Sequence, residues 1–524
     1  MNKTTTLVLL FLSLIMIVYF TSDAIKQVQA ISDVIVTVSD ISLFQNTFQV
    51  GSHFDFSSMW NWIKKSNNSD YIRLASIKMI RMQTYHMDGN IYPCTNWDEN
   101  TQTGTWNWTE VDNITATIRR NGAEPMYCLG SLSLGNKGMP KGMANDTEDI
   151  GFMRKESYVN FCVEWVRHFG SSVRYYELIN EPIGYISPNW NTLDATKLAK
   201  YFEWYVTAYN AMKTVNPSIK ISMDDSTHEG FMDYWLLNGG TFDFLDFHKY
   251  DGWLSPYETP IGTQGCPTDA QYFTKAETTD YVNGTSQYRA VSYMRDKWFK
   301  QKGVMLETFS TETNLNSAWK YGTDPRIQQM CGVVWLALNF RMATLNKMNC
   351  LLYFDFASSF NNKPSGGSGF GMLNSADSKP WFPYYVVQIY GNDLNVGDSI
   401  IDSNASSDFI RTLAWKHGTK LNLLLICKSP TPITVFTGLV PNATVQVSYM
   451  KIEDITGTDY NTSRQLKVGI LDSSGVVTFN GYTVMLLQVT YTGLPFLIEY
   501  SQAIVVTILL LALMIILVKR RSIR

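Results

Sequence analysis

Two glutamates stand at or near the ends of apolar runs, and their chemistry suggests a site. Glu181 lies in the stretch LINEP, directly after the run VRYYE, and Glu312 lies in FSTETN, which follows the run that begins at Val304. Cleaving a glycosidic bond needs one carboxyl that protonates the leaving oxygen and a second that stabilises or attacks the developing cationic carbon. The two glutamates therefore predict glycosidic chemistry, provided that the fold brings them to one pocket.

The neighbours of Glu181 fit the same interpretation. Asn180 supplies a neutral amide that could donate to a sugar 2-hydroxyl, a contact that strengthens as the ring flattens in the transition state. Pro182 has no amide donor, so we expect it to end the strand and to leave Glu181 at the rim. The bare tripeptide Asn-Glu-Pro fits an ordinary strand-end turn equally well.

Other apolar runs end in polar residues that could complete a pocket. Arg81 follows a second run, and His248 and Tyr250 follow a sixth. Because His248 and Tyr250 are two residues apart, both point to the same side of an extended segment, which favours the pocket over a satisfied core histidine. Glu307 is the alternative nucleophile, but it lies mid-run, where its side chain would point into the interior or under a helix, so Glu312 is favoured.

Several tryptophans fall in the segments that follow these runs. Sugars stack their C–H faces on aromatic rings, so one or two of these side chains are expected to bind substrate, with Trp253 the first choice. The alternative is that most of them pack on the rim of the fold, where large aromatics bury much area. The tryptophans concerned are Trp97, Trp106, Trp108, Trp190, Trp253 and Trp319.

The elements that must position these residues alternate from about Gly51 to Gly391. Eight short apolar runs alternate with helical segments or long loops, a pattern that predicts an α/β fold and a (β/α)8 TIM barrel over residues 31–390. A doubly wound open sheet is the second choice, but no Gly-rich turn of the dinucleotide type follows the first run. The eight runs begin at Val50, Ile77, Glu124, Arg174, Ile219, Phe242, Val304 and Cys350.

The pattern changes after Gly391. Runs such as KLNLLLICK and TVMLLQVTY are short, β-branched or aliphatic, and separated by Gly, Pro, Asn or Asp. Such runs are typical of antiparallel strands, so residues 391–493 are predicted to form a C-terminal antiparallel β-sandwich.

Three stretches resemble a known group of enzymes. LINEP, DFLDFHKYDGW and FSTETNLN resemble the strand-four, strand-six and strand-seven signatures of clan A retaining glycoside hydrolases. The stretch GFGMLNSADSKPWFPYYVVQIYGNDLNVGDSII is similar to the barrel–sandwich junction of glycoside hydrolase family 39, the β-xylosidase and α-L-iduronidase family. The sequence departs from that family after Arg81, where RMQTYHMDG lacks the usual His-Gly pair, and in YFDFASS, which lacks a tryptophan. Family 5 is the nearest alternative.

The resemblance implies a role for each residue. Glu181 would be the acid/base and Glu312 the nucleophile, with Asn180 binding a sugar hydroxyl. His248 and Tyr250 would hold the nucleophile or the sugar, and Arg81 would keep the nucleophile ionised, since a nearby cation lowers the pKa of a carboxyl. The expected activity is retaining hydrolysis of β-glycosidic bonds in oligo- or polysaccharides, xylosidase-like first and family 5-like endo-glucanase or mannanase second. The alternative of another class is a non-catalytic surface carbohydrate-binding protein.

Composition and the two chain ends limit the binding partners, the cofactors and the location that we expect for this protein. A net charge of -3 without basic blocks in the body argues against nucleic acid, and no metal-ligand spacing, CxxC pair or phosphate loop predicts a metal or other cofactor. Residues 1–30 fit a signal peptide or N-terminal anchor. Residues 503–518 fit a transmembrane helix, and the basic tail 519–524 would lie in the cytoplasm, which predicts a single-pass cell-membrane protein with its body outside. The sequence leaves the oligomeric state open.

Overall fold

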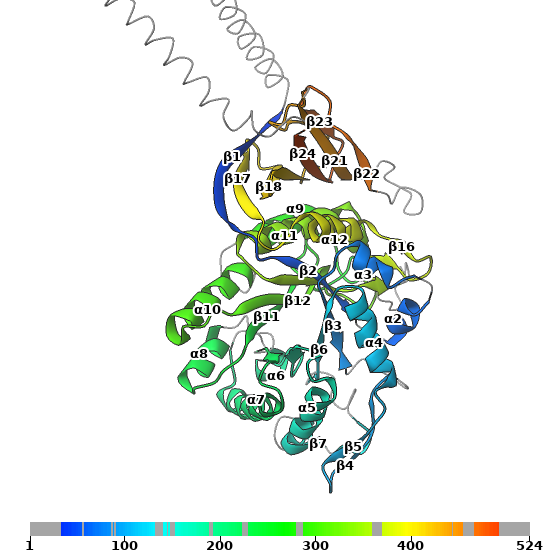
Figure 1. The fold of residues 1–524 in the computed structure, drawn as a ribbon, viewed down its shortest axis with the longest axis vertical. Helices are drawn as coiled ribbons and strands as arrows, with labels where there is room; N and C mark the ends of the chain where they lie inside the picture. The colour runs from blue at the N-terminus through cyan, green and yellow to red at the C-terminus, as the bar shows by residue number, and fades with distance from the viewer. Residues whose placement is uncertain are drawn as a thin grey trace, which may run out of the picture.

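The structure has two packed parts, a barrel of parallel strands and a second sheet above it (Figure 1). It is a computed structural model, and it describes residues 33–491 apart from 55–56, 66, 85–86, 88–90, 132–139, 144, 147–151, 188–191, 223–228, 279–286, 359–368, 443 and 454–465. The predicted N-terminal leader (1–30), membrane span (503–518) and basic tail (519–524) lie outside these residues. Within them, no helix has the length and the apolarity needed to cross a bilayer.

A parallel strand occupies each of the eight predicted runs. Neighbouring strands pair in the order β10-β9-β6-β3-β2-β13-β12-β11, and a parallel bridge between Ser222 and Phe244 joins the two end strands and closes the ring. The mixed α/β fold with a parallel sheet is therefore confirmed. The strands are β2 (Gln49–Phe54), β3 (Met79–Gln83), β6 (Glu124–Cys128), β9 (Tyr175–Glu177), β10 (Lys220–Ile221), β11 (Phe244–Gly252), β12 (Glu307–Asn316) and β13 (Cys350–Tyr353).

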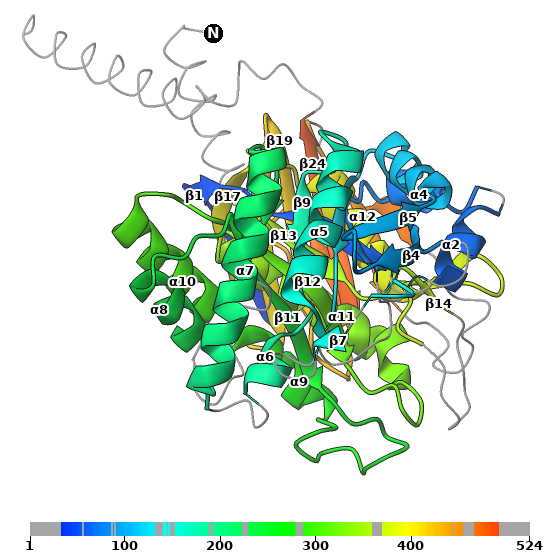
Figure 2. The same cartoon turned by 90° about the horizontal axis from the view of Figure 1, so that it is seen from below.

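Helices follow the strands and surround them (Figure 2). Local sequence explains several of their ends: the Asp194 side chain accepts from the backbone N–H groups of Thr196 and Lys197 at the start of α7, and Gly122 takes a left-handed φ of 85° after α4. The helices are α2 (Ser57–Ile63), α3 (Asp70–Leu74), α4 (Thr109–Arg120), α5 (Lys155–Phe169), α6 (Ile183–Ile186), α7 (Ala195–Val215), α8 (Glu229–Leu237), α9 (Asp269–Glu277), α10 (Gln287–Lys302), η2 (Pro325–Gln328), α11 (Met330–Leu345) and α12 (Phe382–Asp393).

The second sheet differs from the prediction in one strand. β1 (Val34–Gln45), which falls inside the range 31–390 expected for the barrel, pairs antiparallel with β17 and parallel with β20 of the second sheet. The other described pairs of this sheet are antiparallel, in the order β22-β21-β24-β19-β18-β17-β1-β20-β23. Its remaining strands are β17 (Ser399–Ala405), β18 (Ile410–His417), β19 (Lys420–Cys427), β20 (Ile433–Phe436), β21 (Val445–Glu453), β22 (Lys467–Ile470), β23 (Val476–Phe479) and β24 (Thr483–Tyr491).

Two hydrophobic cores meet at this sheet. One side shares a cluster with β20 and β23, which includes Val435 and Phe479, so the sheet packs on itself as a sandwich does. The other side, including Trp415 and Leu424, belongs to the large cluster of the barrel helices. Helices α11 and α12 lie between the sheet and the barrel strands (Figure 1), which explains why nearly every residue of α11 is apolar and buried.

Short strands complete the described chain. They form the hairpin β4 (Cys94–Asp98) with β5 (Thr103–Trp106), the pair β7 (Asn145–Asp146) with β8 (Phe152–Met153), and the three-stranded sheet β14 (Ala357–Ser358), β15 (Leu373–Asn374) and β16 (Lys379–Pro380). All seven cysteines lie among the described residues, are buried and form no disulfide.

Replacing one side chain at the barrel–sheet contact tests whether the two parts fold together. Leu424 is fully buried in the shared cluster, so Leu424→Ala is expected to lower the free energy of unfolding by about 2–5 kcal/mol. Because the cluster joins both parts, urea unfolding followed by far-UV circular dichroism and by tryptophan fluorescence should show one shifted transition. Val468→Ala, at a position that is 72% exposed on β22, is the control and should change stability by less than about 0.5 kcal/mol. Two separate transitions, with only one shifted, would contradict a joint core.

Candidate active site

The candidate site lies at the carboxyl ends of the barrel strands, above a small hydrophobic layer. On β3, Met79, Arg81 and Gln83 are two residues apart and therefore share the inner face. Met79 belongs to a cluster with Tyr175, Phe244 and other inward side chains that fills the lower barrel. Arg81 and Gln83 come next along the strand and are buried, so the polar part of the barrel begins directly above an apolar plug.

Glu181 takes an unusual backbone conformation. Regular pairing of β9 stops at Glu177, and Asn180 resumes it through a bridge with Ser131 and an N–H that donates to the Gly130 carbonyl at 2.7 Å. Glu181 then has a left-handed φ of 48°, which costs a non-glycine residue about 1–3 kcal/mol. The prediction that Pro182 ends the strand is wrong, because β9 already ends at Glu177; Pro182 instead caps the short helix α6. The turn directs the Glu181 side chain toward His248.

Glu312 reaches the pocket through a β-bulge. Phe247 pairs with Ser310 and His248 pairs with Glu312, so Thr311 is an extra residue in β12. Glu307 and Phe309 already point inward, since both approach Tyr175. In a regular strand with Thr311 included, strict alternation would turn Glu312 outward, and the bulge restores its inward direction. The alternation of apolar and polar residues along one strand does not predict where such an extra residue falls.

Three donors hold the Glu312 carboxylate, which is 7% exposed. Arg81 Nη1 and Gln83 Nε2 donate to Oε1 at 2.7 and 2.6 Å, and the Tyr250 hydroxyl donates to Oε2 at 2.9 Å. Arg81 also donates through Nη2 to Oδ1 of Asn180 at 2.7 Å. The structure thus brings Arg81, Asn180, Tyr250 and Glu312 together in one pocket, as expected from the sequence.

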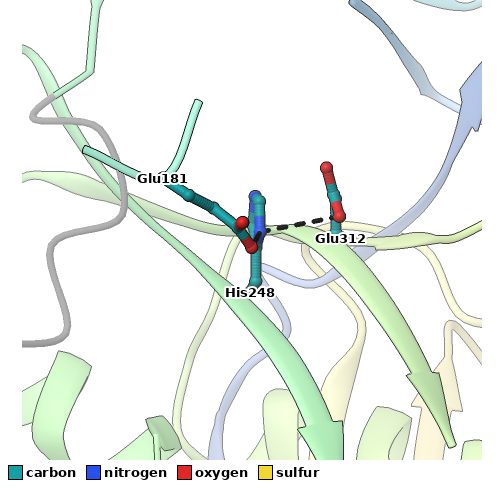
Figure 3. Close-up of side chains that lie close together, drawn as sticks. All are labelled: Glu181, His248 and Glu312. Atoms are coloured by element: carbon teal, nitrogen blue, oxygen red, sulfur yellow. Dashed lines mark hydrogen bonds and ion pairs between the residues drawn. The ribbon is translucent and has the colours of Figure 1, made fainter. Parts of the chain in front are cut away.

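His248 lies between the two glutamates (Figure 3). Its Nδ1 is 2.7 Å from Oε1 of Glu181 and 3.5 Å from Oε2 of Glu312. Burial raises the pKa of Glu181, but the hydrogen bond from His248 and the charges of His248 and Arg81 outweigh burial and hold this pKa below its ordinary range. The Glu181 side chain remains 35% exposed, so it is the more accessible of the two carboxyls.

Three buried residues of this site were not predicted. Glu177 accepts from Arg81 Nε at 2.6 Å, Gln83 binds Glu312, and His53 Nε2 lies 2.9 Å from Arg81 Nη1. Gln83 and Glu177 had a usable signal, because each is spaced by an even number of residues from an inward side chain of its own strand, Arg81 and Tyr175. His53 lies beside Arg81 in the register of β2 and β3, a pairing that only the folded sheet reveals.

The remaining sequence candidates lie elsewhere. Glu307 pairs with Lys220 at 2.7 Å near the opposite end of the strands, so it stays out of the pocket. Trp253 follows the end of β11 and is 50% exposed, with the Lys275 ammonium 5.7 Å from its ring centroid. Trp97 is buried, and Trp106 stacks on Trp108, as the packing alternative proposed. Trp319 is 69% exposed, and Trp190 lies outside the described residues.

The same trio could be considered as a metal site. One donor atom each from Glu181, His248 and Glu312 lies within 4.8 Å of the others. However, both oxygens of Glu312 already accept hydrogen bonds, and the guanidinium of Arg81 lies 2.7 Å from Oε1, where it would repel a cation. The arrangement therefore favours proton transfer and attack by a carboxylate over metal binding.

The fold can be compared with that of known proteins. No protein-family model matches the sequence, and none of the curated proteins matches it either. Among solved structures, the chain is similar to a glucosidase from Croceicoccus marinus (13% identity, TM-score 0.57, covering 88% of this chain and 99% of that one). It is also similar to a family 30 subfamily 8 xylanase from Clostridium acetobutylicum (15%, 0.52, 87% and 99%) and a family 44 endoglucanase from Clostridium thermocellum (13%, 0.52, 87% and 99%). The chain therefore shares the fold of these glycoside hydrolases.

Proposed function

We propose that this protein is a retaining glycoside hydrolase that cleaves β-glycosidic bonds of oligo- or polysaccharides. The observation that carries the proposal is the closeness of the two carboxylates, whose nearest oxygens lie within 4.8 Å of each other. Retaining enzymes place the two carboxyl groups about 5–5.5 Å apart, whereas inverting enzymes need about 6.5–9.5 Å to admit a water. The shared fold with solved glycoside hydrolases supports the same reaction class.

In this proposal Glu312 is the nucleophile. Its carboxylate is buried and oriented by Arg81, Gln83 and Tyr250, so that it loses little freedom when it attacks the anomeric carbon. Attack forms a glycosyl ester with Oε1 or Oε2 of Glu312 and releases the leaving oxygen, which takes up a proton.

Glu181 handles that proton. In its protonated form Glu181 gives the proton to the leaving oxygen, while His248, whose Nδ1 lies 2.7 Å from Oε1 of Glu181, orients the carboxyl. In the second step the Glu181 carboxylate accepts a proton from water, which attacks the ester and frees Glu312. A lowered pKa favours Glu181 in this second role, as the base.

The substrate and the setting are proposed from the sequence. The resemblance to family 39 favours a xylosidase-like specificity, and a family 5-like endo-glucanase or mannanase is the second choice. A non-catalytic carbohydrate-binding protein would have no need of a buried, oriented carboxylate and a second carboxyl beside the same histidine. We place the catalytic body outside the cell, tethered by the span at residues 503–518, on the strength of the sequence pattern at both ends.

The first test removes each carboxyl in turn. Glu312→Ala should abolish turnover of aryl β-glycosides, and azide should restore it with formation of the inverted glycosyl azide, since azide fills the space of the nucleophile. Glu181→Ala should lower the rate with poor leaving groups by about 10²–10⁴-fold, and azide should then give the retained product. Xyloside, glucoside, mannoside and galactoside substrates, followed by polysaccharides, are assayed by product release and by NMR of the azide.

Glu307→Ala is the matched control, because it removes a carboxylate from the same strand outside the pocket. It should keep its activity. If the wild-type protein cleaves none of these substrates but is slowed by polysaccharides in affinity electrophoresis, the carbohydrate-binding alternative replaces the hydrolase.

A second test concerns pH. His248→Asn removes the imidazole that lowers the pKa of Glu181 while burial still raises it, so this pKa should rise. A general acid acts while protonated, and activity falls as the pH rises through its pKa. The basic limb of kcat/KM against pH should therefore move to higher pH in His248→Asn. Tyr250→Phe, which removes a donor to Glu312 instead, should leave that limb in place, and a limb that moves to lower pH in His248→Asn would refute this role of His248.

A third test concerns Trp253. If its exposed ring is a sugar platform, Trp253→Ala should raise KM for oligosaccharides several-fold and leave KM for a short aryl glycoside unchanged, because stacking contributes about 1 kcal/mol or more. Trp319→Ala is measured beside it as a second exposed tryptophan. If the KM for oligosaccharides is the same in Trp253→Ala as in the wild-type protein, this ring lies outside the substrate path.

A further inference from the structure

Glu177 lies below the proposed catalytic pair and touches neither carboxylate of that pair. It is 1% exposed, and its Oε2 accepts from Arg81 Nε at 2.6 Å. Arg81, itself fully buried, donates in addition to Glu312 at 2.7 Å and to Asn180 at 2.7 Å. Because a guanidinium is planar and rigid, fixing Nε also fixes the directions of Nη1 and Nη2. The position of Glu177 is thus transmitted to both Glu312 and Asn180.

The ion pair of Glu177 with Arg81 adds little stability beyond what apolar side chains at the same two places would give. The residue two positions earlier on β9, Tyr175, belongs to the apolar layer of the barrel, and an apolar side chain at position 177 would continue that layer. A buried ion pair is commonly no more stable than apolar side chains of the same volume. Within the described part of the chain, the second oxygen of Glu177, Oε1, has no hydrogen-bond partner, which adds a desolvation cost.

The charges show what Glu177 adds. Arg81 is one cation between two carboxylates, Glu177 and Glu312, at nearly equal distances. The other groups that face Glu312 are Tyr250, Gln83, His248 and, across the pocket, Glu181. If the whole positive charge of Arg81 acted on Glu312, it would stabilise the free carboxylate more than the transition state, in which Glu312 gives up its negative charge to the new bond.

We propose that Glu177 is a positioning residue for the nucleophile: it fixes the guanidinium of Arg81 and takes up part of its charge, so that Glu312 is oriented without being held too strongly. This inference rests on the proposed function, in which Glu312 is the attacking group. Glu177 touches no reacting atom and acts through Arg81.

The test is Glu177→Gln, which keeps the shape and an acceptor for Arg81 Nε but removes the charge. We expect kcat to fall about 10- to 100-fold with KM nearly unchanged, and the acidic limb of the pH–activity profile to move to lower pH, because Arg81 then acts on Glu312 alone. Glu177→Asp, which keeps the charge on a shorter side chain, should lie between the wild type and Glu177→Gln. Glu307→Gln is the control, as it removes the barrel carboxylate paired with Lys220, and should leave kcat and the pH profile unchanged.

A folded Glu177→Gln protein with the kcat and pH profile of the wild type would overturn the inference. A purely structural role would lower the unfolding temperature and leave both readouts unchanged. If Glu177→Gln does not fold, Glu177→Asp is the deciding variant. A wild-type kcat in Glu177→Asp would overturn the inference, because the shorter side chain could no longer position Arg81.

Failure of the proposed function is recognised separately. If the wild-type protein hydrolyses no glycoside, the charge shared through Arg81 is measured by NMR titration of carboxyl-labelled glutamates, with the Glu312 signal assigned through Glu312→Gln. The Glu312 signal should titrate at lower pH in Glu177→Gln, which lacks the charge, than in the wild-type protein. Identical titration curves would overturn the inference without any appeal to activity.

Discussion

The buried guanidinium of Arg81 is the interaction on which the rest of the site depends. A cation without exposure to water is tolerated only where its charge and its donors are matched, and here Glu177, Glu312 and Asn180 match three of its edges. Glu177 ends β9, Asn180 lies three residues beyond it and Glu312 lies on β12, so one side chain of β3 orients groups from two other parts of the barrel. The apolar layer below, with Met79, excludes water from the underside of this network.

Two departures from regular strand geometry bring the carboxylates into reach of each other. The extra residue Thr311 turns Glu312 inward, and the left-handed backbone at Glu181 points its side chain at His248. Both departures cost free energy locally, and both occur where the pocket needs them. The result is an asymmetric pair, with Glu312 enclosed by donors and Glu181 more exposed beside an imidazole. That asymmetry suits one carboxylate to attack and the other to exchange protons with substrate and water.

The second sheet is part of the same folded unit. Its inner side shares a hydrophobic cluster with α11 and α12, and the Arg341 side chain of α11 donates to the Thr412 carbonyl of β18 at 2.7 Å. Helix α11 directly follows η2 after β12, the strand that carries Glu312. The sheet therefore packs, through α11, on the side of the barrel that carries Glu312, and β1, from the other end of the chain, joins β17 to β20 within it.

The sequence by itself determined the eight-strand pattern, the helices between the strands and the identity of Glu181, Glu312, Asn180, His248, Tyr250 and Arg81 as candidates, because alternation and strand ends are local signals. The tertiary structure decided what depends on pairing between distant segments. It assigned β1 to the second sheet, placed the bulge at Thr311, which reverses which residues of β12 face inward, and showed Glu177 and His53 beside Arg81. Register and burial arise only when strands far apart in the chain pair, so no reading of one run at a time contains them.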